Sequence, residues 1–255
     1  MINKKVKCLL LILSLLLPDL VSAQCSNVSE ARQKMNQLVM LKDTIGGLFL
    51  KETNNLVIDV NQYVINNDSV TVGLLVLNDS PNHSPKDSIK HDYSAYWKDK
   101  NGTSNRYTWV FVLEDFQKRC LEKGIDSTHY NVESGALSKR LCQFLGLSDT
   151  DRRDTIVYMK VLAKNLFRPS YNTDIKTRTT PNYAGINYFI NNLDITNRRW
   201  MLQQQFTNTY PWTRMGYTYD WGDRSNYVGV TEFILEPNTT FVGKTDYHVV
   251  GDYLK

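Results

Sequence analysis

Apolar and polar residues follow two different periods along this chain, one helical and one extended. Between Ser29 and Thr44, apolar residues recur every three or four positions with charged residues between them, which predicts an amphipathic helix beginning near Ser29. The pair Gly46-Gly47 predicts where that helix stops. Helical spacing or a closing glycine predicts three further helices, over residues 114–123, 134–145 and 196–206.

Short β-branched and apolar runs predict strands between these helices. Residues 56–60 and 70–77 flank the turn-forming Asn66-Asn67-Asp68 and are predicted to pair as a hairpin. This order of helices and strands predicts a single α+β domain over residues 24–255, with the polar, proline-containing segment 78–90 as the one candidate for a division. The remaining strands are predicted over residues 107–113, 155–162, 229–235 and 240–250, and residues 170–194 are predicted to be a loop.

The first 23 residues have the three parts of a cleavable secretory signal peptide. Lysines up to Lys7 form a positive region, Leu9 to Leu17 is a nearly unbroken apolar run, and Val21-Ser22-Ala23 supplies small residues before a cut after Ala23. The apolar run is shorter than the ~20 residues that a spanning helix needs, so no transmembrane segment is expected after cleavage. We therefore expect a secreted or periplasmic protein.

The cysteines leave two questions open. Cys25 stands near the expected new N-terminus, but bacterial lipoprotein signals carry a small residue before the lipidated cysteine, whereas Gln24 stands there. The sequence therefore favours a released protein over one anchored through Cys25. Cys120 and Cys142 either form a disulfide that closes a loop of about 20 residues or remain two buried thiols on adjacent helices.

Composition and charge narrow the classes of function. A chain with 42% hydrophobic and 22% charged residues is typical of a globular protein. Its net charge of +4 falls to about +2 without the signal peptide, and no basic patch is visible, so nucleic-acid binding is not expected. The four histidines show no paired spacing and there is no CxxC motif, so no metal site is expected either.

Candidate chemistry concentrates between residues 160 and 235. Arg168 directly follows a predicted buried strand, aromatic and polar side chains crowd residues 210–222, and Glu232 lies on a short strand entered through Gly229. An arginine can bind phosphate oxygens at two points, a hydroxyl can orient a ligand, and a carboxylate can stabilise a cation that develops during a reaction. These positions are therefore the candidates for a functional site.

The order of an arginine, a strand containing Ser or Thr, and a glutamate resembles the Arg–Ser/Thr–Glu order of ADP-ribosyltransferase toxins and related secreted NAD glycohydrolases. Over residues 160–250, the resemblance assigns the catalytic positions to Arg168, Thr218 and Glu232. It implies NAD as the substrate, with Arg168 on the pyrophosphate. It also implies that Tyr217 and Tyr219 stack on the nicotinamide ring.

Structural interpretations of the same residues stand beside this one. Arg168 can pair with an acid at a strand end, and Glu232 on a strand of period two can face solvent. Asp220 and Asp223 can also join Glu232 as a glycosidase-like set of carboxylates. A packed core or an interface is the ordinary place for an aromatic group such as Trp212, Tyr217, Tyr219 and Trp221.

Two hypotheses of different classes follow. The first is a secreted, toxin-like enzyme that consumes NAD by ADP-ribosyl transfer or hydrolysis. The second is a non-enzymatic periplasmic or extracellular protein that binds a protein or cell-surface target through an aromatic surface. The enzyme requires Arg168, Thr218 and Glu232 to converge on one cleft, whereas the binding protein requires an exposed, contiguous aromatic patch.

Overall fold

The structure of the protein is a computed structural model. The predicted signal peptide and the candidate division at residues 78–90 lie outside the residues that it describes. Within the described part, helices and an antiparallel sheet form one mixed arrangement, so the predicted α+β class is confirmed. The structure describes residues 25–35, 57–59, 63–77, 106–150, 153–170, 172–181, 194–206, 210–223, 225–242 and 246–255.

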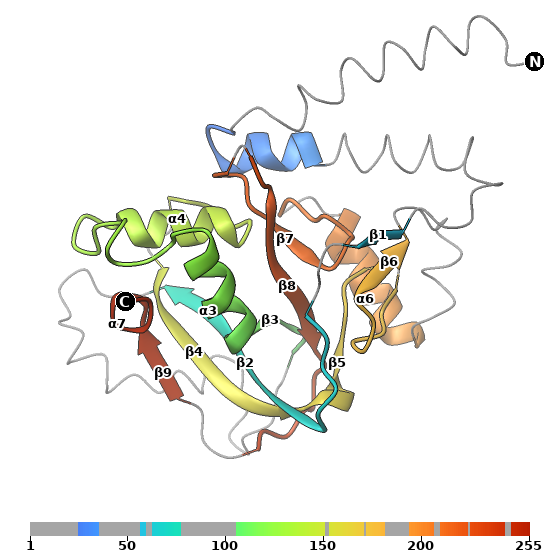
Figure 1. The fold of residues 1–255 in the computed structure, drawn as a ribbon. Coiled ribbons are helices and arrows are strands. Elements are labelled where there is room, and N and C mark those ends of the chain that lie inside the picture. The colour runs from blue at the N-terminus through green and yellow to red at the C-terminus, as the bar shows by residue number, and fades with distance from the viewer. Residues whose placement is uncertain are drawn as a thin grey trace, which may run out of the picture.

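A seven-stranded antiparallel sheet forms the centre of the described part of the chain (Figure 1). The strands follow the order β5-β8-β3-β2-β4-β9, and β7 pairs with β8 beside this path. Two further strands, β1 (Val57–Asp59) and β6 (Thr179–Pro181), form a separate small sheet. The central strands are β2 (Ser69–Leu77), β3 (Thr108–Val112), β4 (Arg153–Leu162), β5 (Leu166–Phe167), β7 (Tyr217–Tyr219), β8 (Val228–Leu235) and β9 (Asp246–Val249).

The hairpin predicted for residues 56–60 and 70–77 is wrong. Val57 to Asp59 pair with Thr179 to Pro181, a segment of the predicted loop. β2 instead pairs with β4 along its whole length and with β3 on its other side. Because both edges of β2 are taken by other strands, β1 has no edge of β2 to join. The strand predicted over residues 240–250 ends one residue earlier than expected, since α7 (Val250–Tyr253) follows β9 directly.

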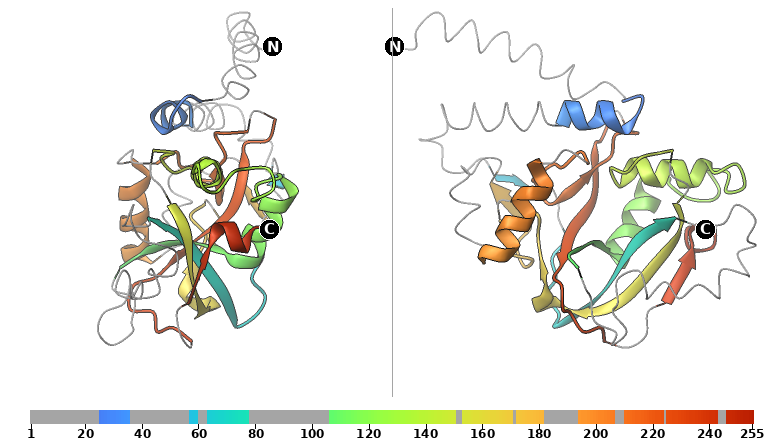
Figure 2. Two further views of the ribbon diagram at one scale, coloured as in Figure 1. Left: turned by 90° about the vertical axis from the view of Figure 1, so that its left-hand side faces the viewer. Right: turned by 180° about the vertical axis from the view of Figure 1, so that it is seen from behind.

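Helices cover one face of the sheet in two separate groups. α3 (Leu113–Glu122) and α4 (Ala136–Phe144) pack with α7 over an apolar cluster that includes Phe116, Leu141 and Val230. α6 (Ile195–Phe206) packs farther along β8, where Met201 contacts Ile234. Figure 1 and the rear view in Figure 2 both show α4 and α6 on opposite sides of β8. The two groups of helices therefore cover different parts of the same face of the sheet.

The other face of the sheet is closed by a second apolar cluster. Alternate residues of β2, β3 and β4 contribute side chains such as Val72, Val110 and Val157. From β8, Phe233 and Leu235 join the same cluster and are fully buried. Since side chains alternate across a strand, the residues between them must point to the helix-covered face.

The first described residues pack against the β7–β8 region. Residues 28–35 are helical, and Ala31 and Met35 are buried together with Cys25, Tyr219 and Trp221. A reciprocal cap stabilises the start of this helix, because Asn27 Oδ1 accepts from the Glu30 N–H and a Glu30 carboxylate oxygen accepts from the Ser26 N–H. The predicted helix over residues 29–44 is seen to residue 35, and its remainder lies outside the described residues.

Candidate functional site

Strand β8 brings Glu232 to the helix-covered face of the sheet. Thr231 and Phe233, its two neighbours, face the opposite side, where Phe233 is fully buried. The register is fixed on one edge by pairing of Glu232 with Phe111 in β3 and on the other by pairing of Ile234 with Phe167 in β5. Glu232 therefore faces the space between the two groups of helices.

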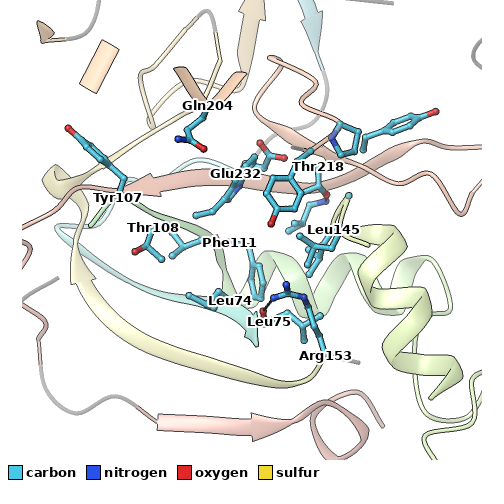
Figure 3. Close-up of a pocket in the computed structure, with 18 of the residues that line it drawn as sticks. Leu74, Leu75, Tyr107, Thr108, Phe111, Leu145, Arg153, Gln204, Thr218 and Glu232 are labelled. Carbon is cyan, nitrogen blue, oxygen red and sulfur yellow. Dashed lines mark hydrogen bonds between the residues drawn. The ribbon is translucent and has the colours of Figure 1, made fainter. Parts of the chain in front are cut away.

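A cavity of about 480 Å³ occupies this space (Figure 3). Its volume lies in the range of pockets that hold small organic molecules. The wall combines side chains from β2, β3, β7 and β8 with the end of α4 and one residue of α6. The lining residues are Leu74, Leu75, Arg106, Tyr107, Thr108, Trp109, Val110, Phe111, Leu145, Gly146, Leu147, Arg153, Gln204, Tyr210, Pro211, Thr218, Tyr219, Val230 and Glu232.

Aromatic rings dominate the wall near β3. Trp109 stacks on Trp212 with ring centroids 3.6 Å apart, and Tyr210 meets Trp109 edge-on at 6.5 Å. Tyr107 stacks on Trp200 of α6 at 4.5 Å, and its hydroxyl donates to Asn197 Oδ1 at 2.6 Å. These contacts tie α6 to β3, so this side of the cavity is preformed and presents ring edges and faces.

Glu232 is the acidic residue in this wall, and its carboxyl group is buried. The side chain is 4% exposed, and among the described residues no hydrogen bond or ion pair reaches its carboxyl oxygens. Burial raises the pKa of Glu232 well above its ordinary value, because a charged carboxylate would lose its hydration without gaining a partner. Burial therefore favours the protonated form of the group, which has one O–H to donate and a carbonyl oxygen to accept.

Thr218 reaches the same cavity, but its hydroxyl is already used. Oγ1 donates to the Phe144 carbonyl at 2.8 Å and accepts from the Val230 N–H at 3.0 Å. It therefore joins the end of α4 to β7 and β8. Gly229 permits this close approach, since a Cβ there would collide with Thr218 Oγ1 and with the Phe144 carbonyl. The structure places Thr218 in the wall as a residue that holds the wall together.

Arg168 does not line the cavity. It is fully buried on the other side of β8, with its guanidinium carbon 5.1 Å from the centre of the Phe233 ring. It donates to the main-chain carbonyls of Tyr63 and Thr177 at 3.0 Å and of Asp174 at 3.4 Å. Burial lowers the pKa of Arg168 to about 10, which leaves it charged.

The convergence that an NAD clamp requires is therefore incomplete. Glu232 and Thr218 share one cavity, whereas Arg168 contacts Phe233, which points away from Glu232. Within the described residues, Arg168 fastens three chain segments together and has no path to a ligand beside Glu232.

The tyrosines expected to stack on a ligand are both buried, and they differ in position. Tyr217 is 3% exposed and does not line the cavity, whereas Tyr219 forms part of the wall. The Tyr219 hydroxyl and the Cys25 thiol share a hydrogen bond, and burial raises the pKa of both groups. Trp212 and Trp221 are buried as well, so these four rings form no exposed aromatic patch. Tyr219 and Trp221 share one apolar cluster, whereas Trp212 stacks on Trp109.

Asp220 and Asp223 belong to an ion cluster instead of the cavity. Asp220 is fully buried and accepts two hydrogen bonds from Arg140, at 2.7 and 2.8 Å. Lys123 lies 3.0 Å from Asp220 and 2.9 Å from Asp223. These carboxylates are neutralised by the protein itself and have no free oxygen poised beside Glu232 as a glycosidase pair would need.

Several wall residues were not identified from the sequence. Trp109, Gln204 and Arg153 lie in strands and a helix far apart along the chain, and only the sheet topology brings them together. The aromatic run in β3 was the one local signal available, since Tyr107, Trp109 and Phe111 alternate at the period of a strand and so share one face.

Three further expectations concern the cysteines, metal-binding side chains and membrane-spanning helices. Cys25, Cys120 and Cys142 are free and buried, so the alternative of two buried thiols is the one that the structure contains. No cluster of three or more His, Cys, Asp or Glu side chains with metal-binding geometry occurs among the described residues. None of the described helices has the length and apolar character needed to cross a membrane.

Comparison with protein-family models, with curated proteins and with solved structures finds no match for this chain. The functional assignment is therefore built on the geometry of the cavity.

Proposed function

We propose that this protein binds a small, mainly apolar organic molecule in the cavity between α4 and α6, with Glu232 as the hydrogen-bonding group in its wall. One observation carries the proposal. A buried carboxyl group, with no hydrogen-bond or ion-pair partner in the described part of the chain, lines a preformed aromatic cavity of about 480 Å³. Perturbed acids in concave apolar sites are characteristic of binding and catalytic centres.

The cost of burying Glu232 supports this assignment. An unsatisfied buried polar group destabilises a fold by about 1–3 kcal/mol, and a leucine at this position would avoid that cost. A fold retains such a group where a bound molecule supplies the missing hydrogen bond. The neutral acid can donate to a carbonyl or ether oxygen of a ligand while the rings around Trp109 contact its apolar part.

We place the site of action outside the cytoplasm. The signal-peptide pattern at residues 1–23 supports export, and the buried Cys25 thiol supports a released form over a lipid-anchored one. A lipid on Cys25 would require the thiol to leave its contacts with Tyr219 and Met35. Mass spectrometry of the exported protein should find an unmodified N-terminus at Gln24, and a lipidated Cys25 would overturn this placement.

A fluorescence titration of residues 24–255 with N-phenyl-1-naphthylamine tests the binding function. This neutral probe brightens when its rings enter an apolar cavity. Gln204→Trp fills the cavity from α6, whereas Gln203→Trp adds the same side chain at the exposed neighbouring position. We expect Gln204→Trp to weaken binding at least about tenfold and Gln203→Trp to leave it unchanged. Equal probe binding by both variants would refute the cavity as the site.

An NAD-consuming enzyme is the second candidate, and the shared position of Glu232 and Thr218 favours it. In this function Glu232 would act in its ionised form, as a carboxylate that stabilises the ribosyl cation as nicotinamide leaves, without Arg168 as a phosphate clamp. NAD turnover should then fall by about 10²-fold or more in Glu232→Gln, which keeps the shape of the side chain and removes its ionisation. Absent or equal turnover in wild type and variant would reject the enzyme and leave the binding function.

A further inference from the structure

The neighbours of Glu232 on its own face of the sheet are apolar. Val230 and Ile234 are the two same-face neighbours along β8, and both are fully buried. Across the sheet, Phe111 of β3 is the register partner of Glu232. None of these three side chains has a hydrogen-bonding atom, so they supply no partner for the Glu232 carboxyl.

The other edge of β8 brings a glycine beside Glu232. The Glu232 N–H donates to the Gly216 carbonyl at 3.0 Å, which joins the two backbones at this point. Gly216 has a φ of 79°, in the left-handed region that glycine adopts without strain. The position beside Glu232 on this edge therefore has no side chain that could pair with the carboxyl.

The missing partners of Glu232 define the polar group of a ligand. In the protonated form, which burial favours, the carboxyl presents an O–H donor and a carbonyl acceptor side by side. An ether, ketone or ester oxygen can accept from the O–H, but it leaves the carbonyl oxygen of Glu232 without a partner. A neutral amide that carries an N–H on the same edge as its oxygen satisfies both atoms. An ammonium or amidinium group would instead require the ionised carboxylate, whose burial costs more.

We propose that the natural ligand carries a neutral primary amide or lactam group on a ring-bearing apolar body, and that this group forms two hydrogen bonds with Glu232. The amide oxygen accepts from the carboxyl O–H, and the amide N–H donates to the carbonyl oxygen of the same carboxyl. The body of the ligand lies against Trp109 and Phe111, the aromatic side chains of β3 in the wall. This inference rests on the proposed function, because it assigns the ligand class of the same cavity.

Three naphthalene derivatives with one aromatic body test the pairing, by displacing N-phenyl-1-naphthylamine from residues 24–255. 2-Naphthamide offers both an acceptor and an N–H donor, methyl 2-naphthoate offers only acceptors, and 2-naphthamidine is a cation that offers only donors. The amide should bind at least about tenfold tighter than the ester and the amidine. Equal affinities of the amide and the ester would overturn the two-point pairing. Tightest binding of the amidine would overturn the neutral ligand class in favour of a cation.

Variants of Glu232 then locate the preference for the amide over the ester. Glu232→Gln still offers a donor and an acceptor and should retain the preference, whereas Glu232→Met offers neither and should reduce it to within about twofold. Glu133→Met makes the same change at an exposed position outside the wall and should keep the wild-type preference. Near-ultraviolet circular dichroism reports whether each variant is folded. A tenfold preference retained by folded Glu232→Met would overturn the pairing with Glu232.

Failure of the binding function has a different result. If N-phenyl-1-naphthylamine binds equally to wild type and to Gln204→Trp, the cavity is refuted as the site, and the ligand class is refuted with it. If Gln204→Trp weakens the binding of this probe but wild type shows no preference for the amide, the ligand class alone is overturned.

Discussion

Two buried acidic residues of this protein, Asp220 and Glu232, lie in adjoining parts of the fold and have opposite environments. Asp220 receives two hydrogen bonds from Arg140 and lies 3.0 Å from a second cation, Lys123, whereas no described residue bonds or pairs with the carboxyl of Glu232. The first acid is compensated by the protein and contributes to stability. The second has no partner among the described residues and borders the cavity, which is the basis of the binding role proposed for it.

Removing the compensation at Asp220 should have the largest effect. Asp220→Asn leaves Arg140 and Lys123 buried without their shared carboxylate, and we expect a loss of about 3–5 kcal/mol in the free energy of unfolding. Urea unfolding followed by circular dichroism measures it. Asp223→Asn, at the more exposed end of the same cluster, is the control and should cost much less. A loss below about 1 kcal/mol for Asp220→Asn would show that the cluster is not a stabilising unit.

The pH dependence of stability should show the difference between Asp220 and Glu232 through the titration of Glu232. The folded protein keeps its proton on Glu232 at pH values where the unfolded chain, with an ordinary pKa near 4.5, has lost it. Raising the pH above that value therefore favours unfolding, at up to about 1.4 kcal/mol per pH unit until the folded pKa is reached.

Glu232→Gln removes this titration. The stability of the variant relative to wild type should rise as the pH increases from 5 to 7, by at most about 1.4 kcal/mol per pH unit, as measured by urea unfolding at each pH. Asp126→Asn is the opposite control, because the hydrogen bond from Thr128, followed by that from His129, lowers the pKa of Asp126. That carboxylate stabilises the fold above its unfolded pKa and loses its effect as the pH falls. A pH-independent difference between wild type and Glu232→Gln would contradict the neutral acid.

Within the cavity wall, the hydroxyl of Thr218 makes its hydrogen bonds inside the protein. Like the ion cluster and unlike Glu232, it should therefore stabilise the fold. Thr218→Val keeps the shape of the side chain but leaves the Phe144 carbonyl and the Val230 N–H without their partner, so we expect a loss of about 1–2 kcal/mol. Thr108→Val, at a partly exposed position of the same wall, should cost less than about 0.5 kcal/mol. Equal costs in urea unfolding would remove the distinction between the two threonines.

The smallest expected effect concerns the reactivity of the thiols. It is tested without any substitution, by measuring how fast each cysteine reacts with a thiol reagent. Cys25, Cys120 and Cys142 should be protected in the native protein, and all three should react after unfolding. Cys25 should react first, because only the first described segment must open, whereas Cys120 and Cys142 belong to the larger cluster under α3 and α4. A single reactive thiol in the unfolded, unreduced protein would establish the Cys120–Cys142 disulfide instead.

Local pattern predicted most of the elements of this fold but not their pairing. The helices near residues 114–123, 134–145 and 196–206 were predicted because their spacing and closing glycines are encoded within a few turns. β1 was assigned to the wrong partner because its actual partner, β6, lies more than a hundred residues away. No periodicity within either segment records that contact.

The candidate site was predicted in the same partial way. Glu232 and Thr218 were identified by residue type and order, and both reach the cavity. Arg168 was grouped with them because order along the chain does not show on which side of β8 a neighbouring segment packs. Arg153 was missed for the complementary reason, since a single arginine at the start of a strand has no local signature until β2 lies beside it.

The alternation of β8 implies a competition between two strand registers. A slip by one residue would turn Glu232 toward Arg168 and turn Phe233 into the cavity. The two opposite charges would then neutralise each other, and the cavity would lose its acid. The pairs that β8 makes with β3 on one edge and with β5 on the other hold the strand against this slip. The strands on either side of β8, β3 and β5, thus keep Arg168 and Glu232 on opposite faces of β8. This separation leaves the carboxyl of Glu232 available to the ligand that we propose.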